Sequence, residues 1–260
     1  MRKALLAFLL GTTCGYSLYL GSPSLPDSAV EGFFISKECG FGLKLGYQGD
    51  NVAHKSLYVT NSHVVDSIKQ IHYLMQQGVI TLNFVNRFEL YGSLGEIQFH
   101  MSPKVNSSIQ DVFATGNRFT WGFGGRGILF SFSKASLGLD FKYQLASPHF
   151  QWMTQNGAPL SPIGASKLRY REWQVGLSLA YQTDIFAPYL GAVYNQMEGQ
   201  YRQLPSNILP GQESYFSMKS RKKFGMAVGT TLTTGKIFEM DVEARLINET
   251  AFSIAGNVRF

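Results

Sequence analysis

Few side chains in this sequence have the types and spacing that catalysis or ligand binding requires. The glycine-rich stretch GFGGRG at 122–127 superficially matches a phosphate-binding loop, but it lies within an aromatic segment and no helical pattern follows it. A strand with a bend or bulge is therefore the better interpretation. The histidines lack the companion ligands of common metal motifs; they are His54, His63, His72, His100 and His149. We expect no metal site, no cofactor and no enzymatic reaction.

The remaining candidate functional residues are charged side chains that alternate with apolar ones along the sequence. Between Phe238 and Leu246 every second residue is charged, and the residues between them are apolar or small. A period of two is the pattern of a β-strand with one polar and one apolar face. Similar alternation recurs at 41–47, 136–145, 172–181, 223–232 and 251–260.

If the bulky apolar faces of these strands meet lipid, the opposite faces line the lumen of a barrel. The pore-lining residues predicted in this way are Lys44, Arg87, Glu89, Arg126, Asp140, Lys142, Glu172, Lys223, Glu239, Asp241, Glu243 and Arg245. Bases and acids balance, so we expect no strong ion selectivity. The small inward residues at 176, 178, 180, 225, 227 and 229 favour an open pore. The alternative is that the charges pair with each other and fill a narrow barrel.

Composition supports a β-protein and excludes several other classes. The 260 residues are 45% hydrophobic and 15% charged, with 27 Gly, 20 Phe and 13 Tyr, which is too aromatic and too weakly charged for intrinsic disorder. No apolar run approaches the roughly 18 to 20 residues of a membrane-spanning helix. The net charge is +6, and the single short basic cluster at 219–223 does not indicate a nucleic-acid partner.

Strand length and aromatic placement favour a membrane barrel over a soluble sandwich. Several candidate strands exceed the usual five or six residues and approach the roughly 9 to 11 that cross a bilayer at a tilt. Aromatic residues stand at the ends of apolar faces, as at Trp173 and Tyr181 or Phe252 and Phe260. The sequence therefore predicts an all-β fold, a transmembrane antiparallel β-barrel of about 12 strands, with 10 to 14 possible. The barrel must close, because unpaired edge groups in lipid each cost several kcal/mol.

The predicted strands leave three long segments as loops. The strand candidates are 41–49, 54–61, 80–94, 96–102, 118–131, 134–146, 168–182, 185–198, 222–233, 236–247 and 250–260. The expected loops are 102–117, 147–167 and 199–220. The segment 62–78 has helix-compatible spacing of Val65, Ile68, Ile71 and Leu74.

The first residues have the pattern of a secretory signal peptide. Arg2 and Lys3 precede an apolar run at 4–10, and small residues follow, so we expect cleavage after Ser17 and a single barrel domain at 18–260. Cleavage also removes Cys14 and leaves Cys39 as the one cysteine. An internal disulfide is then impossible. Cys39 is either an inert thiol or forms a disulfide to another chain.

Ordered blocks of the sequence resemble the chlamydial major outer membrane porin family. They are YREWQVG at 170–176, PYLG at 188–191, KSRK at 219–222, VGTT at 228–231, EARLINE at 243–249 and VRF at 258–260, with NRFELY at 86–91, FTW at 119–121, GRG at 125–127, LGLDFKY at 137–143, LKLGYQGD at 43–50 and GSP at 21–23. Together these blocks cover about half of the chain that remains after cleavage. The chain is shorter than usual family members and has one mature cysteine where the family has several.

The resemblance implies a barrel in the outer membrane of a Gram-negative bacterium of chlamydial type, in contact with membrane lipid. It also implies a homotrimer that passes small hydrophilic solutes and ions by passive diffusion. Cys39 lies where the family has part of a cysteine cluster. The alternative function is a closed structural or adhesive barrel whose surface loops bind envelope or host partners.

Overall fold

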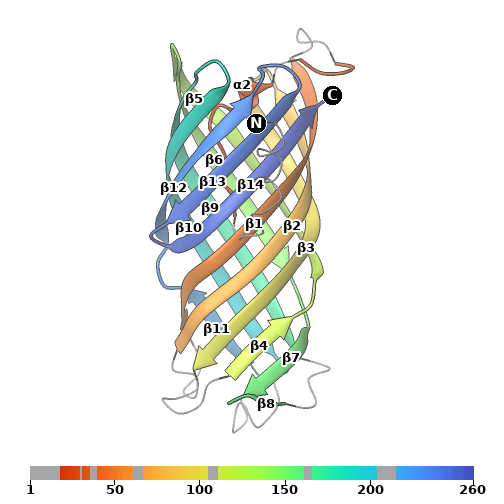
Figure 1. The fold of residues 1–260 in the computed structure, drawn as a ribbon, viewed down its shortest axis with the longest axis vertical. Coiled ribbons are helices and arrows are strands. Elements are labelled where there is room, and N and C mark those ends of the chain that lie inside the picture. The colour runs from red at the N-terminus through yellow and green to blue at the C-terminus, as the bar shows by residue number, and fades with distance from the viewer. Residues whose placement is uncertain are drawn as a thin grey trace, which may run out of the picture.

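A tall barrel of antiparallel strands encloses one short helix, α2 (Leu25–Ser28), at its upper end (Figure 1). This computed structural model describes residues 18–29, 31–35, 40–60, 67–104, 111–160, 166–203 and 215–260. The strands are β1 (Phe41–Val59), β2 (Ser67–Phe84), β3 (Phe88–Lys104), β4 (Asp111–Thr115), β5 (Arg118–Phe132), β6 (Ala135–Ala146), β7 (Phe150–Gln155), β8 (Ala158–Pro159), β9 (Lys167–Tyr181), β10 (Phe186–Arg202), β11 (Tyr215–Ser220), β12 (Phe224–Thr233), β13 (Phe238–Leu246) and β14 (Glu249–Arg259). Among the described residues, no helix has the length and apolarity needed to cross a bilayer.

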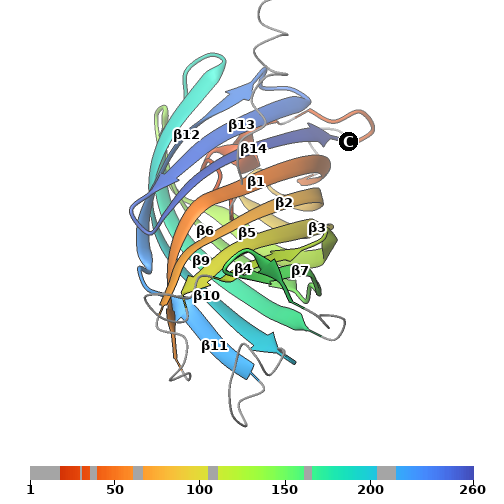
Figure 2. The same cartoon turned by 60° about the horizontal axis from the view of Figure 1, so that its bottom comes forward.

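The strand pairing closes a ring of ten strands, which forms the upper part of the barrel (Figures 1 and 2). In the described chain, each pairs antiparallel with the next in the order β1-β14-β13-β12-β10-β9-β6-β5-β3-β2, and β2 pairs again with β1. A closed ring has no free edge, as a sheet in lipid requires. The antiparallel barrel is thus confirmed. Its ring has ten strands, the lower bound of the predicted range rather than twelve, and the other strands lie below it.

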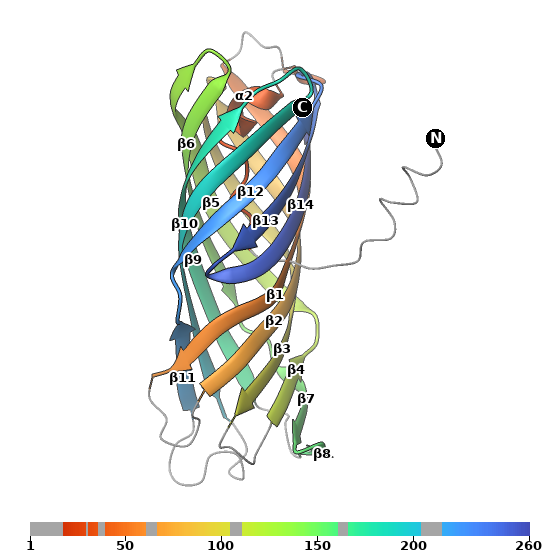
Figure 3. The ribbon, with the colours of Figure 1, turned by 60° about the vertical axis from the view of Figure 1, so that its left-hand side comes forward.

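The lower part of the barrel has a different ring, because the hairpin of β13 and β14 ends halfway down (Figure 3). Below this hairpin, β11 pairs with β1 on one side and with β10 on the other. There β4 and β7 take the places of β5 and β6, and a bridge between His149 and Lys167 joins the start of β7 to β9. In the described residues this ring has eight strands. We call the two regions the ten-strand half and the eight-strand half.

Side chains exchange faces between the two halves, as β9 shows. In the ten-strand half its outward residues are Trp173, Val175, Leu177, Leu179 and Tyr181, and its inward residues are polar or small. In the eight-strand half Arg169 and Arg171 point outward, while Leu168 and Tyr170 are fully buried inside. On this strand the apolar exterior of a membrane-spanning barrel is therefore confined to the ten-strand half.

Aromatic side chains mark the boundary between the halves. Trp173, Tyr194 and Phe224 lie side by side on β9, β10 and β12, with ring centroids 5.3 Å and 5.0 Å apart. From Trp173 to Tyr181 the apolar face of β9 measures roughly 26 Å along the strand at about 3.3 Å per residue. At a tilt of about 40° this is roughly 20 Å along the barrel axis, close to the apolar band of outer-membrane barrels.

The eight-strand half has an apolar interior of aromatic residues and methionines. Phe99 packs against Tyr73 and Tyr170, with centroids 5.2 Å and 5.1 Å apart, and Tyr201 stacks on Phe216 at 4.2 Å. The other fully or nearly fully buried members of this cluster include Leu57, Ile71, Met75, Ile97, Met101, Phe113, Phe150, Met153, Met197 and Met218. This half is a filled barrel of the kind expected for eight strands.

Connection lengths indicate which end faces the periplasm. The connections at the upper end are short, for example from β12 to β13, whereas twelve residues separate Arg202 of β10 from Tyr215 of β11 at the lower end. In outer-membrane barrels the turns are short on the periplasmic side and the loops are longer outside. The ten-strand half with α2 is therefore the periplasmic part.

Several sequence-based element boundaries were wrong. The candidates 41–49 and 54–61 are one strand, β1, with a bulge between Val52 and His54. The segment 62–78, whose spacing was compatible with a helix, belongs to β2 from Ser67 onward, and 80–94 contains a tight turn with Val85 and Asn86 at positive φ. The expected loops 102–117, 147–167 and 199–220 contain β4, β7, β8 and β11, which build the eight-strand half.

Candidate pore interior

Ten of the predicted pore-lining side chains are buried in the barrel interior. They are Lys44, Glu89, Arg126, Asp140, Lys142, Glu172, Glu239, Asp241, Glu243 and Arg245. Each lies in the ten-strand half or at its lower boundary, on a strand whose neighbouring residues point to the lipid side. The alternation of β13, for example, sends Glu239, Asp241 and Glu243 inward and leaves Phe238 half exposed.

Arg87 and Lys223 do not lie on this interior wall. Arg87 is exposed in the turn between β2 and β3, and Lys223 is half-buried in the connection that precedes β12. The prediction failed at both positions because the alternation was extended beyond the ends of the strands, where the chain turns and the two-residue period no longer holds.

A first ionic cluster lies near the periplasmic end. The Lys44 ammonium is 2.8 Å from the Glu89 carboxylate and 3.0 Å from that of Glu239. The Arg126 guanidinium lies 3.6 Å from Glu89 and 3.7 Å from Asp140, and it also lies over the Tyr91 ring. Five charges from five strands thus form one chain of ion pairs across the lumen.

A second ionic cluster lies at the level where the two halves meet. The Arg245 guanidinium is 2.7 Å from Glu243, 3.1 Å from Glu249 and 3.8 Å from Asp50. Lys55 pairs with Glu249 at 2.8 Å and also with Glu172. Asp50, Lys55 and Glu249 were not predicted as interior residues.

These three residues escaped the sequence prediction for identifiable reasons. The bulge between Val52 and His54 shifts the alternation of β1 by one residue, so Lys55 points inward. Asp50 lies between the apolar alternation and that bulge. Glu249 was expected in a turn, but it is the first residue of β14. A signal was present for Glu249, because the alternation of β14 extends back to it, and for Asp50, which lies six residues after Lys44 and so on the same face of β1.

The N-terminal segment at 18–29 occupies the lumen of the ten-strand half. Leu18, Tyr19, Leu20 and Leu25 are almost completely buried there. The Leu20 and Gly21 amides each donate a hydrogen bond of 2.9 Å to the Glu243 carboxylate. We call residues 18–29 the plug segment.

Charged and polar side chains of the wall donate hydrogen bonds to the carbonyl groups of the plug segment. Lys142 donates to the Tyr19 carbonyl at 3.1 Å and Lys44 to the Leu25 carbonyl at 2.7 Å. Arg245 donates to the Leu18 carbonyl, Asn83 to that of Pro26, Thr233 to that of Ser28 and Arg259 to that of Ala29. The wall therefore satisfies backbone groups that would otherwise be buried without partners.

Glycines in the wall provide the space for this segment. A Cβ added to Gly176 would lie 2.0 Å from the Leu20 Cδ1 atom, and one at Gly191 would lie 2.6 Å from the Leu20 Cδ2 atom. Small inward residues were expected to leave an open lumen. At Gly176, one of those predicted positions, and at Gly191, which was not predicted, the glycines instead accommodate the Leu20 side chain.

At the periplasmic mouth, a hollow of about 270 Å³ lies between the plug segment, at Ser24, Asp27 and Ser28, and the ends of the strands. The space is much smaller deeper in the lumen, beside Tyr19. A cavity of about 20 Å³ lies beside Tyr19, Lys44, Glu89 and Arg126, which is room for about one water molecule. The described conformation of the barrel is therefore closed. The predicted signal peptide at 1–17 and Cys39 lie outside the described residues.

A closed barrel with an apolar lipid-facing band and an ionic interior defines a transmembrane protein of the outer-membrane class. Residues 211–260 match the family described as "Chlamydia major outer membrane protein". This match confirms the resemblance found in the sequence, and the protein is located in the outer membrane.

Two curated relatives extend this similarity to the rest of the chain. The major outer membrane porin of Chlamydophila psittaci is 27% identical over 213 residues, which cover 57% of this chain and 53% of that protein. The porin of Chlamydia pneumoniae is 24% identical over an alignment of 390 residues, which covers 100% of this chain and 99% of that protein. The first alignment thus spans about half of its relative. Among solved structures, the outer membrane protease OmpT of Escherichia coli has a TM-score of 0.41 at 11% identity, covering 85% of this chain and 96% of that one.

Proposed function

We propose that the protein is an outer-membrane porin for small hydrophilic solutes and ions, and that the described conformation is its closed state. The observation that carries the proposal is the ionic wall of the lipid-spanning half, where ten predicted residues face the interior. Similarity to porins supports it. We assign the protein no enzymatic reaction.

The ionic wall has little value for stability alone. Burying a paired charge costs desolvation that the pairing barely repays, and well-packed apolar residues often give an equal or more stable interior. The eight-strand half shows that this chain can build such an apolar interior. Ion pairs in the ten-strand half are therefore best explained by a lumen that fills with water when the plug segment leaves.

Opening requires two movements. The plug segment must leave the ten-strand half, where water can replace its hydrogen bonds to the wall but its buried leucine side chains lose apolar contacts. The apolar cluster around Phe99 and Tyr201 must also part, because it closes the path through the eight-strand half. The same cluster favours a second candidate function, a closed structural or adhesive barrel.

Sugar-dependent swelling of proteoliposomes distinguishes the two functions. In a Cys39→Ser background, the double variant Leu20→Cys/Gly176→Cys places two thiols where the plug segment meets β9. We expect the oxidised form to be impermeable to small sugars and reduction to restore the uptake of the parent protein. Each single variant is the matched control and should not respond to reductant.

Impermeability of the parent protein, with its barrel intact by heat-modifiability on gels, would instead support the closed structural barrel. Equal permeability of oxidised and reduced forms would remove the plug segment from the conduction path. Gels with and without reductant also test two further proposals, the homotrimer and a disulfide between chains through Cys39.

A further inference from the structure

A basic patch covers the outer wall of the eight-strand half next to the lipid band. It consists of outward side chains of β9, β10 and β11: Lys167, Arg169, Arg171, Arg202 and Lys219, with Glu198 as its one acid. The charges thus sum to an excess of four positive charges. None of these groups takes part in the interior ion pairs described above.

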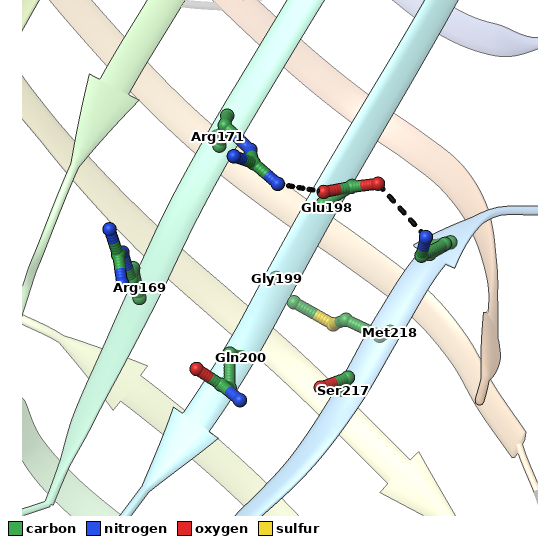
Figure 4. Close-up of a pocket in the computed structure, with 8 residues that line it drawn as sticks. Arg169, Arg171, Glu198, Gly199, Gln200, Ser217 and Met218 are labelled. Atoms are coloured by element: carbon green, nitrogen blue, oxygen red, sulfur yellow. Dashed lines mark hydrogen bonds and ion pairs between the residues drawn. The ribbon is translucent and has the colours of Figure 1, made fainter. Parts of the chain in front are cut away.

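Strand register brings the patch together. Glu198 is directly opposite Arg171 on β9 and Lys219 on β11, and in the next row Gln200 is opposite Arg169 and Ser217. These side chains line a shallow pocket of about 230 Å³ (Figure 4). The strand pairing therefore fixes the spacing of the cations without any loop.

The cations of the pocket are incompletely neutralised. Arg171 and Lys219 share the Glu198 carboxylate, the latter at 3.0 Å. Arg169 has no hydrogen bond or ion pair with any described residue, and in Figure 4 its side chain stands apart from the Glu198 carboxylate. Arg169 also borders a second hollow of about 490 Å³, which it shares with Arg118 and Trp121. A group with several anionic oxygens would satisfy these guanidinium donors.

The patch lies at headgroup depth. On β9, Arg171 is the next outward residue after Trp173, which belongs to the aromatic boundary of the lipid band, and Arg169 follows it. The distance from Trp173 to Arg169 is roughly 13 Å along the strand at about 3.3 Å per residue. A lipid whose acyl chains cover Val175 and Leu177 thus has its headgroup beside these arginines.

Among the side chains that the structure describes on β2 and β3, on the opposite side of the barrel, there is no Lys or Arg at this level. The outward residues of β2 and β3 beyond the lipid band include His72, Gln76, Glu96, Gln98 and His100. General enrichment of Lys and Arg at a membrane interface would place them around the whole barrel. In the described side chains they instead lie in one sector of the wall, on β9, β10 and β11 with Arg118 of β5 beside them, which indicates one site.

We propose that this patch binds the phosphate groups of an anionic lipid in the outer leaflet of the membrane. Guanidinium groups bind phosphate oxygens in a bidentate manner, and clustered basic residues at a membrane surface attract anionic headgroups. A lipid is the ligand because the patch is continuous with the apolar band, so one molecule contacts both. The two hollows on either side of Arg169 fit a headgroup with two phosphates.

Binding of a defined lipid to the full-length barrel in neutral detergent tests the proposal. The probes are diphosphoryl lipid A and the same lipid without its phosphates. We expect the phosphorylated form to bind at least about tenfold more tightly, since each charge-assisted hydrogen bond contributes about a factor of ten or more. Arg169→Gln/Arg171→Gln should abolish this preference, and Glu198→Gln should strengthen it by freeing Arg171 and Lys219.

The matched control removes two exposed charges at the other end of the barrel, Arg87→Gln/Lys134→Gln, and should keep the preference of the parent protein. Heat-modifiability on gels verifies that each variant has a folded barrel. Equal binding of the two lipids, or an equal loss in the control, would overturn the proposal. So would displacement of the lipid by millimolar inorganic phosphate, or a preference for a sulfated polysaccharide over lipid A.

Discussion

The two halves of the barrel share the strands β1, β2, β3, β9 and β10 but place apolar side chains on opposite faces. On β10, Leu190 points outward and Gly191 inward in the ten-strand half, whereas Gln200 points outward and Tyr201 inward in the eight-strand half. At one end of this strand the apolar side chains point outward, as in a membrane-spanning barrel. At the other end they point inward, as in a water-soluble barrel. The level of the reversal marks where lipid ends.

The different surroundings of the two halves explain this reversal. Around the eight-strand half the solvent is water, so burying Phe99 or Tyr201 inside removes apolar surface from water and stabilises the fold. Around the ten-strand half the solvent is hydrocarbon, which is as apolar as a protein core, so no hydrophobic force draws such residues inward. The interior is then available for ionic groups and for the plug segment.

The largest expected effect follows from this difference in solvent. Phe99→Ala leaves a cavity in the apolar cluster and should lower the free energy of unfolding by about 3 to 5 kcal/mol. Phe123→Ala, on the outward face of β5 in the ten-strand half, should cost clearly less because acyl chains fill the space. Urea titration of both variants in lipid vesicles measures the difference. Equal losses of unfolding free energy would mean that Phe99 and Phe123 have the same environment.

The next-largest expected effect on stability concerns an ion pair in the barrel interior. Lys55→Met leaves the buried Glu172 carboxylate without its cation, which should cost about 3 to 5 kcal/mol. The control is Lys219→Met on the outer wall, where the partner Glu198 is hydrated and the loss should not exceed about 1 kcal/mol. Urea titration of both variants in lipid vesicles measures these losses as well. A small effect at Lys55 would show that water already reaches this level of the lumen.

How much could be predicted from the sequence also differs between the halves. In the ten-strand half, period-two alternation predicted the strands and placed Lys44, Arg126 and Glu243 inside. In the eight-strand half the same reasoning misled, because Ile68, Ile71 and Leu74 were interpreted as one helical face. Of these, Ile71 is buried in the core while Leu74 is on the outer wall.

The plug segment could not be predicted at all. Residues 18–29 have no period, and their position depends on partners more than 200 residues away, such as Glu243 and Arg245. Lys55 is a similar case, because its inward direction depends on a bulge that no local residue pattern specifies. The features that period-two alternation did not predict therefore depend on contacts between segments that are distant in the sequence.

A matched pair of substitutions on one face of β10 locates the lipid boundary. Leu190→Arg places a cation among acyl chains and should destabilise the barrel by about 2 to 4 kcal/mol. Gln200→Arg makes the same charge beyond the boundary and should change stability by less than about 1 kcal/mol. Titration with guanidinium chloride measures the free energy of folding of both variants into lipid vesicles. A large penalty at Gln200 would move the boundary into the eight-strand half.

The smallest expected effect is a pH dependence on the outer wall of the eight-strand half. Hydrogen bonds from Arg171 and Lys219 lower the pKa of Glu198, which lies beyond the lipid band, to about 2. In the unfolded chain its pKa is about 4.3, so the folded state favours the ionised form. This stabilisation is present above pH about 4.3 and disappears as the pH falls toward 2. Because the pair is partly hydrated, it should amount to less than about 1 kcal/mol.

The stability difference between the parent protein and Glu198→Gln should therefore be constant near neutral pH and vanish in acid. A difference that persists at pH 2 would mean that packing, rather than charge, holds Glu198 in the patch.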